Sequence, residues 1–178
     1  MTKLSSLIFI LAVITSIHAI AVNVNKLDIR DEGDPMTVTV ENETVFCSFL
    51  PRVSGQTISS SESNAVAYCT QNTTNAPNAR IFPDGFILTK HFASGDGYVQ
   101  ITGLINRSIY VVPNDGGGQY DIKAPVGANC TGYDSFVNLV EPDVGRFCIR
   151  CCKKTVSDKC PRGRSEAGCE SIIPGTYS

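Results

Sequence analysis

The sequence predicts a mainly β protein, a single β-sandwich or barrel held together by disulfides and containing one short helix. Eight cysteines follow an apparent secretion signal, which indicates a disulfide-stabilised exported domain. Short segments rich in β-branched and aromatic residues are separated by turn residues. Strands do not alternate with long helical segments, so a parallel βα architecture is not expected.

Residues 1–21 are predicted to be a signal peptide. Lys3 precedes an apolar run over residues 7–14, and Ala19 and Ala21 place small residues at the positions that signal peptidase reads. We expect cleavage after Ala21, with Ala19 as the second choice. The alternative, a membrane anchor, is disfavoured because the apolar run is shorter than the ~20 residues of a membrane span. The carboxyl end lacks the hydrophobic tail of a lipid-anchor signal.

The chain after the signal peptide has about 157 residues, which suits one domain. Residues 22–35 are acidic and poor in pattern, so we expect a flexible acidic arm there. The cysteine-rich β-domain is expected to span residues 36–178. It is therefore predicted to begin with the first strand-like segment.

Within this domain the elements follow from local pattern. Alternation of β-branched and aromatic residues predicts strands, serine before helix-forming residues predicts one short helix, and Pro142 with Gly145 predicts the clearest hairpin turn. In order we expect strands at 36–40 and 44–49, a helix within 59–69, a loop at 71–77, strands at 86–92 and 98–104 around a turn at 94–97, a strand at 108–112, and a hairpin of 135–140 with 146–150.

The cysteines are predicted to form up to four disulfides, with the pairing left open. They are Cys47, Cys69, Cys130, Cys148, Cys151, Cys152, Cys160 and Cys169. Cys151 and Cys152 are adjacent on a predicted strand, so they should point to opposite faces and take different partners, with Cys47, Cys69, Cys160 and Cys169 as available mates. A zinc site is the alternative, but oxidised thiols and a single histidine after the signal argue against it. We expect no metal and no cofactor.

Four Asn-x-Ser/Thr sequences are candidate N-glycosylation sites in a secreted chain, at Asn42, Asn72, Asn106 and Asn129. Asn129 is the weakest candidate, because Cys130 is the middle residue of its triplet and a disulfide competes with glycosylation there.

Cations are concentrated between residues 146 and 164. They are Arg146, Arg150, Lys153, Lys154, Lys159, Arg162 and Arg164. Such a segment is a candidate site for an anionic ligand, namely acidic or cell-wall polysaccharide, a host surface or an anionic membrane. The alternative is a solvated segment whose charges only keep the protein soluble. Nucleic acid is not expected, because the chain is acidic overall and does not interleave aromatic with basic residues.

The sequence favours a non-catalytic extracellular protein, either a surface antigen or an effector that acts on a host. His91 is the only histidine after the signal, it lies within a predicted strand, and no Gly-x-Ser-x-Gly nucleophile motif is present. The alternative is a small carbohydrate-active hydrolase with a carboxylate pair drawn from Asp84, Asp96, Asp121, Asp134, Glu141 and Asp143. The chain has no tryptophan, so a sugar is expected to stack only singly, on Tyr98, Tyr110, Tyr120 or Tyr133.

Several segments resemble a group of small secreted cysteine-rich fungal proteins, often labelled immunoreactive mannoproteins or macrophage-activating glycoproteins. The resemblance covers about residues 46–177 and is carried by residues 82–86, 116–121, 124–128, 137–142, 147–152 and 173–175. Its most specific part is Phe-Cys-Ile-Arg-Cys-Cys at 147–152. The resemblance implies a fungal source, secretion and a wall or extracellular role, and it supplies no catalytic residues.

Overall fold

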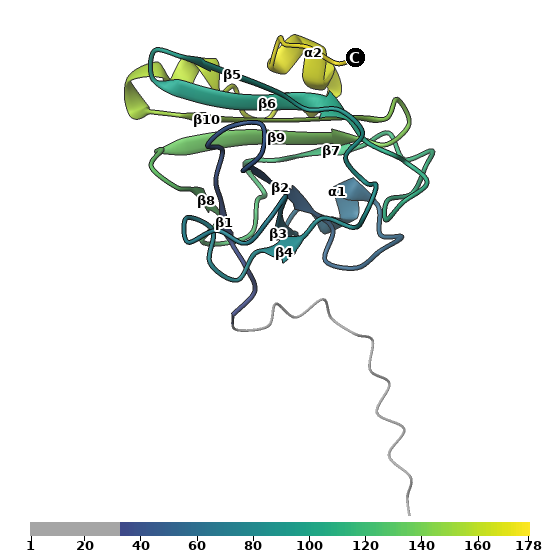
Figure 1. Ribbon diagram of the computed structural model, residues 1–178. Coiled ribbons are helices and arrows are strands. Elements are labelled where there is room, and N and C mark those ends of the chain that lie inside the picture. Colours follow the sequence, from purple (N-terminus) through teal and green to yellow (C-terminus); the bar gives the residue numbers. More distant parts are fainter. Residues whose placement is uncertain (1–32) are drawn as a thin grey trace, which may run out of the picture.

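The computed structural model describes residues 33–178, with ten short strands and four short helical segments (Figure 1). The predicted signal peptide and most of the predicted acidic arm lie outside the described residues. The strands are β1 Thr37–Val38, β2 Cys47–Leu50, β3 Val66–Cys69, β4 Arg80–Ile81, β5 His91–Gly95, β6 Tyr98–Leu104, β7 Gly118–Tyr120, β8 Asn129–Cys130, β9 Ser135–Glu141 and β10 Arg146–Cys152. The helices are α1 Ile58–Ser61, α2 Gly168–Ile172 and the 3-10 helices η1 Lys154–Lys159 and η2 Ser165–Ala167.

The strands form three sheets. A five-stranded antiparallel sheet has the order β5-β6-β10-β9-β7, a three-stranded sheet has the order β2-β3-β4, and β1 pairs in parallel with β8. β10 lies at the centre of the large sheet and pairs along its whole length with β6 and β9. The mainly β, sandwich-like class predicted from the sequence is confirmed. The helical content is several short segments rather than one helix.

The five-stranded sheet is covered on both faces. Its first face packs on the three-stranded sheet, where Phe49 stacks on Phe136 at 5.3 Å between ring centroids and Phe46 on Phe147 at 5.9 Å. Its second face is covered by α2 and the chain around it, with Cys169, Ile172 and Ile173 buried there (Figure 1). β9 and β10 are therefore buried on both sides, unlike strands of a sheet that faces water.

Side chains of β10 alternate between these two cores. Phe147, Ile149 and Cys151 enter the core between the sheets, whereas Cys148 and Cys152 enter the core under α2. The disulfides follow this alternation: Cys151 joins Cys130 of β8, Cys152 joins Cys160, and Cys148 joins Cys169 of α2. The fourth disulfide joins Cys47 to Cys69, which are directly opposed on β2 and β3. The prediction that Cys151 and Cys152 take different partners is confirmed, although Cys130 was not among the mates expected.

A buried amide connects the two main sheets. Asn138 on β9 is fully buried; its Oδ1 accepts hydrogen bonds from the backbone N of Phe49 at 2.7 Å and from Ser48 Oγ at 3.1 Å. Its Nδ2 donates to the carbonyl of Cys148 at 2.9 Å. A buried polar side chain is tolerated only when its hydrogen bonds are made, so this residue also fixes the relative position of the sheets.

Two expected elements differ in the structure. The predicted helix within 59–69 ends at Ser61, because Val66–Cys69 pairs with β2 and becomes strand β3. Residues 108–112 form no strand, and Tyr110 has a positive φ of 73° that places its hydroxyl 2.5 Å from the Tyr68 hydroxyl. Pairing and packing with distant residues override local propensity at both places.

Other boundaries shift while the predicted hairpins remain. The hairpin of β9 and β10 is confirmed, with Glu141 opposite Arg146. The turn between β5 and β6 is shorter than predicted, because Gly95 already pairs with Tyr98. In the predicted strand at 86–92, Ile87 forms only an isolated bridge with Ile105, and β5 begins at His91.

The first described residues belong to the domain. Asp34 forms an ion pair with Arg52 at 3.0 Å, and the carbonyl of Pro35 accepts a hydrogen bond from the backbone N of Ala67. Asp34 and Pro35 therefore contact the rest of the domain, while the domain boundary at residue 36 stays a prediction. Within residues 33–178, none of the helices has the length and apolar character that crossing a membrane requires.

The disulfides under α2 should contribute unequally to stability. Removing Cys148–Cys169 (both to Ala) should destabilise the fold by about 3 kcal/mol, because this bridge closes a 21-residue separation in the unfolded chain. Removing Cys152–Cys160 should cost roughly 1 kcal/mol less, since its separation is 8 residues. Denaturant unfolding of the two double variants measures the difference. Equal losses would show that unfolded-chain entropy does not set these contributions.

Candidate functional site

A surface pocket of about 310 Å³ lies at the end of β10, between the chain segment that follows β7 and the start of β9. Its walls combine polar, charged and aromatic groups from four separate parts of the sequence. The lining residues are Asp121, Ala124, Pro125, Val126, Gly127, Ala128, Asn129, Cys130, Tyr133, Asp134, Ser135, Phe136 and Arg162.

The adjacent cysteines of β10 anchor two walls of this pocket. Cys151 is bonded to Cys130, which itself lines the pocket beside Asn129. Cys152 is bonded to Cys160, two residues before Arg162. Because the two sulfurs leave β10 on opposite faces, one disulfide fixes β8 and the other fixes the segment that carries the arginine.

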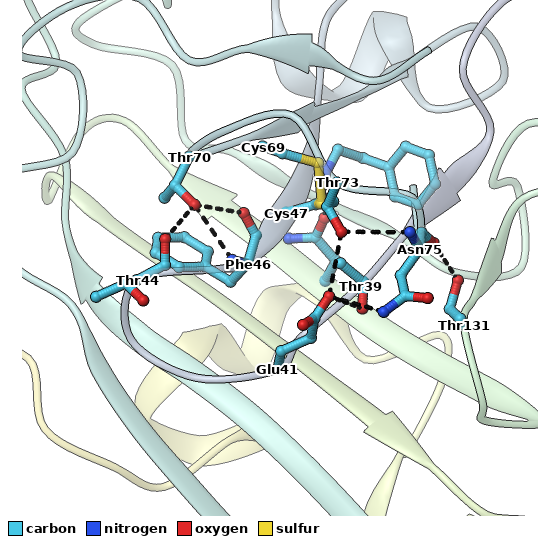
Figure 2. Close-up of a disulfide and its surroundings, with 12 residues drawn as sticks. Thr39, Glu41, Thr44, Phe46, Cys47, Cys69, Thr70, Thr73, Asn75 and Thr131 are labelled. Atoms are coloured by element: carbon cyan, nitrogen blue, oxygen red, sulfur yellow. Dashed lines mark hydrogen bonds between the residues drawn. A yellow bond between two sulfur atoms is a disulfide. The ribbon is translucent and has the colours of Figure 1, made fainter. Parts of the chain in front are cut away.

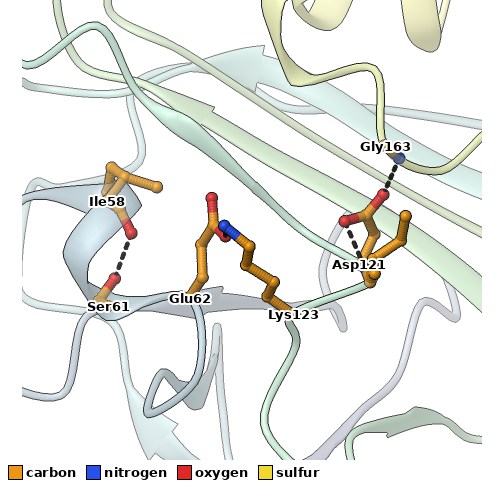
Figure 3. Close-up of polar contacts among 7 residues, drawn as sticks. Ile58, Ser61, Glu62, Asp121, Lys123 and Gly163 are labelled. Carbon is orange, nitrogen blue, oxygen red and sulfur yellow. Dashed lines mark hydrogen bonds and ion pairs between the residues drawn. The ribbon is translucent and has the colours of Figure 1, made fainter.

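Hydrogen bonds hold that segment against β7. Asp121 accepts one hydrogen bond from the backbone N of Ile122 and another from the backbone N of Gly163 (Figure 3). Gln119 donates to the carbonyl of Pro161 at 3.2 Å and accepts from the backbone N of Arg164 at 3.2 Å. Three hydrogen bonds from β7 and its end thus flank Arg162 on both sides.

Glycine is required beside Arg162. Gly163 has a φ of 72°, which L side chains rarely adopt, and a Cβ there would lie 2.9 Å from Cδ1 of Ile122. The same edge carries an ion pair between Lys123 and Glu62 at 3.8 Å (Figure 3), with the lysine largely exposed. This pair connects the chain after β7 to the end of α1.

The opposite wall is held by the start of η1. Oδ2 of Asp134 accepts a hydrogen bond from the backbone N of Lys154 at 2.8 Å. Nζ of Lys153 lies 5.1 Å from the centroid of the Tyr133 ring and donates to the carbonyl of Gly132. The tyrosine ring is therefore fixed by a cation–π contact at the rim of the pocket.

Three groups in the pocket have unused hydrogen-bonding capacity. The guanidinium of the exposed Arg162 makes no ion pair or hydrogen bond to any of residues 33–178. Oγ of Ser135 is buried from solvent and has no hydrogen-bond partner in the same range. Asp134 uses one carboxylate oxygen on Lys154. Buried polar atoms are normally satisfied, so the serine hydroxyl leaves a hydrogen bond unmade within residues 33–178, beneath the wall of the pocket.

The two carboxylates of the pocket have structural partners. Asp121 and Asp134, both among the candidates for a hydrolytic pair, line the same pocket, and each accepts hydrogen bonds from backbone N–H groups. Glu141, another of those candidates, accepts a hydrogen bond from the backbone N of Cys169 at 3.1 Å, and burial raises its pKa above the usual glutamate value. It does not line this pocket.

The structure divides the predicted cationic segment. Lys153, Lys154 and Arg162 lie at or near the pocket, and Arg164 lines a separate shallow hollow. Arg146 forms an ion pair with Glu170 at 3.1 Å, and Lys159 lies 5.0 Å from the Tyr98 ring centroid. The seven cations therefore do not form one continuous patch.

Arg150 corrects the expectation of an anion-binding residue. It is 9% exposed; its Nε and one terminal nitrogen donate to Oε1 of Gln100 at 2.8 and 2.6 Å, and the other donates to the carbonyl of Lys159 at 2.8 Å. Its guanidinium also lies 4.8 Å from the Tyr98 ring centroid. Burial lowers the pKa of Arg150, and the neighbouring Tyr98 acts in the opposite direction. This arginine stabilises the core under α2 and is not available to a ligand.

Of the four tyrosines considered for sugar stacking, Tyr133 is the one that lines this pocket, and Lys153 contacts its ring. Tyr120 is fully buried, Tyr110 packs against Tyr68, and the Tyr98 ring is covered by two cations.

His91 is half-exposed, and its Nε2 lies 2.9 Å from the Ser178 carbonyl oxygen. Within residues 33–178, no three His, Cys, Asp or Glu side chains are grouped so as to bind a metal.

The sequence named most of the polar pocket residues for unrelated reasons and did not bring them together. Asp121 and Asp134 were considered as acids, Tyr133 as an aromatic and Arg162 as part of a charged run. Ser135 was missed altogether. The sequence signal that could have located the pocket was the adjacency of Cys151 and Cys152. Because their side chains point to opposite faces, their two disulfide partners bring two chain segments together at this end of β10.

Because Arg150 is buried and hydrogen-bonded, its substitution should destabilise the fold, whereas substitution of an exposed cation nearby should not. Arg150→Met should lower the free energy of unfolding by about 1–3 kcal/mol, because the acceptors on Gln100 and Lys159 lose a charged donor. Lys154→Met, at an exposed position, should change it by less than ~0.5 kcal/mol. Thermal or urea unfolding of both variants tests this. A loss for Arg150→Met no larger than that of the control would contradict the structural role.

Comparison with known proteins gives a distant relative. The chain is similar to the appressorium protein ROW1 of Mycosarcoma maydis, with 29% identity over 150 aligned residues. The alignment covers 74% of this chain and 34% of that protein, so the chain spans about a third of the relative's length. No protein-family model and no solved structure matches the chain. A fungal relative and four disulfides are consistent with an extracellular protein of a fungus, while the likeness to mannoproteins stays a prediction.

Proposed function

We propose that this chain is a secreted, non-catalytic extracellular protein of a fungus that binds polysaccharide of a cell wall through the pocket around Arg162. Four disulfides support the extracellular part, because such bridges persist in oxidising compartments and are rare in the cytosol. The similarity to an appressorium protein supports a fungal protein of the cell surface or its surroundings.

The observation that carries the binding proposal is the composition of the pocket. Arg162 and Tyr133 bring an aromatic ring and a guanidinium that makes no hydrogen bond or ion pair within residues 33–178 into one hollow of about 310 Å³, and Ser135 lines the same hollow with its hydroxyl buried. Ligand sites are commonly hollows of ~300–1,000 Å³ with a few convergent polar groups. Sugar hydroxyls both donate and accept hydrogen bonds, so a mixture of cationic donors, carboxylate acceptors and one ring suits a carbohydrate.

The charges of the pocket favour a neutral saccharide over a polyanion. Asp121 and Asp134 line the pocket together with its single arginine, and their negative charges repel an acidic chain. Arg150 is buried and Arg146 is already paired with Glu170. Fewer cations of residues 146–164 are therefore available to an anionic ligand than the sequence alone indicates.

A small hydrolase is the second candidate, because Asp121 and Asp134 line one pocket. A carboxylate pair of that kind needs one member to act as an acid and the other as a base or nucleophile. Asp121 accepts hydrogen bonds from the backbone N–H groups of Ile122 and Gly163, and Asp134 accepts one from that of Lys154, so both carboxylates have structural partners. That arrangement supports binding better than acid catalysis.

Arg162→Gln should weaken polysaccharide binding by about tenfold or more, because a hydrogen bond from a charged donor contributes ~1.5–3 kcal/mol. Tyr133→Ala should weaken it similarly through loss of the stacking surface. Arg164→Gln is the matched control and should bind like wild type, since Arg164 does not line this pocket. Binding to fungal and plant wall glycans on an array, followed by titration calorimetry, measures these effects.

Three outcomes would overturn parts of this proposal. Absence of binding to every wall glycan would remove the binding function. Binding that falls steeply between 20 and 150 mM salt would indicate an acidic ligand instead of a neutral one, because exposed charges are screened over ~8 Å at physiological salt. Release of new reducing ends from a bound glycan, lost in Asp134→Asn, would establish the hydrolase.

A further inference from the structure

The four candidate glycosylation sites differ in the freedom of the asparagine amide nitrogen, which is the atom that carries an N-linked glycan. Asn42 lies in the tight turn between Val40 and Phe46, which form an isolated antiparallel bridge. Its side chain is exposed, and its Oδ1 accepts three hydrogen bonds, from the backbone N and Oγ1 of Thr44 at 2.8 and 2.6 Å and from the backbone N of Val45 at 2.9 Å.

These three donors fix the orientation of the Asn42 amide. Because all three need an acceptor, the oxygen faces the turn and the nitrogen faces away from it. Nδ2 of Asn42 donates no hydrogen bond to residues 33–178. A glycan on this nitrogen therefore extends outward and leaves every hydrogen bond of the turn in place.

Asn72 lies in the polar loop that follows β3. Its side chain is exposed and makes no hydrogen bond within the described part of the chain. The next residue, Thr73, donates to Oε1 of Glu41 at 3.3 Å and accepts from the backbone N of Asn75 at 3.2 Å. The backbone around Asn72 is therefore fixed while its own amide is free.

The two loops are joined side by side next to the Cys47–Cys69 disulfide (Figure 2). Oε1 of Glu41 accepts hydrogen bonds from Thr73 and from Nδ2 of Asn75 at 3.0 Å, and Thr70 Oγ1 donates to the carbonyl of Thr44 at 2.7 Å. Asn42 follows Glu41 and Asn72 precedes Thr73, so glycans on both would emerge next to each other at the end of the three-stranded sheet where β2 begins and β3 ends.

Asn129 differs from Asn42 and Asn72 because its amide nitrogen is already hydrogen-bonded. Its Nδ2 already donates to Thr37 Oγ1 at 3.1 Å and to the carbonyl of Gly127 at 3.0 Å, so both amide hydrogens are used. Cys130 is buried in a disulfide, and Thr131 Oγ1 donates to the carbonyl of Asn75. A glycan on Asn129 replaces one of its amide hydrogens and removes one of these two hydrogen bonds, of which the bond to Thr37 connects β8 with β1.

We propose that Asn42 and Asn72 carry N-linked glycans that form one pair at the end of the three-stranded sheet where β2 begins and β3 ends, and that Asn129 stays unmodified. This inference rests on the secretion part of the proposed function. It does not depend on ligand binding by the pocket, although Asn129 is among the lining residues. Asn106 is half-buried, with its Oδ1 accepting from the backbone N of Ser108 at 3.1 Å, and it belongs to neither group.

Glycopeptide mass spectrometry of the protein secreted by a yeast host tests the proposal. The full chain is expressed with its own first residues and, separately, behind an established yeast leader. The peptides that contain Asn42 and Asn72 should each carry a glycan, and the peptide that contains Asn129 should be bare. Asn42→Gln and Asn72→Gln should each remove one glycan from the intact protein. Asn129→Gln and the control Asn114→Gln, at an exposed asparagine outside any such triplet, should remove none.

The chain expressed with its own first residues tests secretion, and the chain expressed behind the yeast leader tests which asparagines are glycosylated. Absence of the chain with its own first residues from the medium would contradict secretion. The leader version enters the secretory pathway regardless, so its glycopeptides decide the second claim alone. Unmodified Asn42 or Asn72 in that version, or an occupied Asn129, would overturn the inference.

Discussion

The structure depends on one constraint, the alternation of side chains along β10. Residues 148, 151 and 152 of this central strand are cysteines, and alternation sends Cys151 into the core between the sheets while Cys148 and Cys152 enter the core under α2. Three of the four disulfides therefore start from one strand and leave it in both directions. They attach β8 on one face, and α2 and the chain before it on the other.

The pocket is a consequence of this arrangement. Its two walls come from segments about 30 residues apart in sequence, Asn129–Cys130 and the chain around Arg162, and each is bonded to one of the adjacent cysteines. Asp121 and Gln119 then complete the wall by holding the chain on either side of Arg162. A rigid framework of this kind positions polar side chains without a large core, which suits a small extracellular domain that recognises a ligand.

Much of the fold was accessible from local pattern, and most of the site was not. The β9–β10 hairpin, the mainly β class and the opposite directions of Cys151 and Cys152 follow from alternation and turn residues, which are local properties. The strand Val66–Cys69 was missed because pairing with β2 overrides the preceding helix signal. Arg150 looked like one more surface cation, since nothing in its neighbourhood shows that Gln100, 50 residues away, supplies a buried acceptor. The pocket was missed for a related reason, because Arg162 is brought to residues 121–136 by the Cys152–Cys160 disulfide and by hydrogen bonds with Gln119 and Asp121.

Disulfide mapping of the unreduced protein tests the central role of β10 most directly. Trypsin cleaves after Arg146, Arg150 and Lys153 and so separates Cys148 from the adjacent pair. The account predicts that the peptide 147–150 is linked to the peptide that contains Cys169, and that the peptide 151–153 is linked at once to those that contain Cys130 and Cys160. Fragmentation between residues 151 and 152 should then assign Cys130 to Cys151 and Cys160 to Cys152. A link from Cys148 to Cys130, or an exchange of partners between Cys151 and Cys152, would contradict the account.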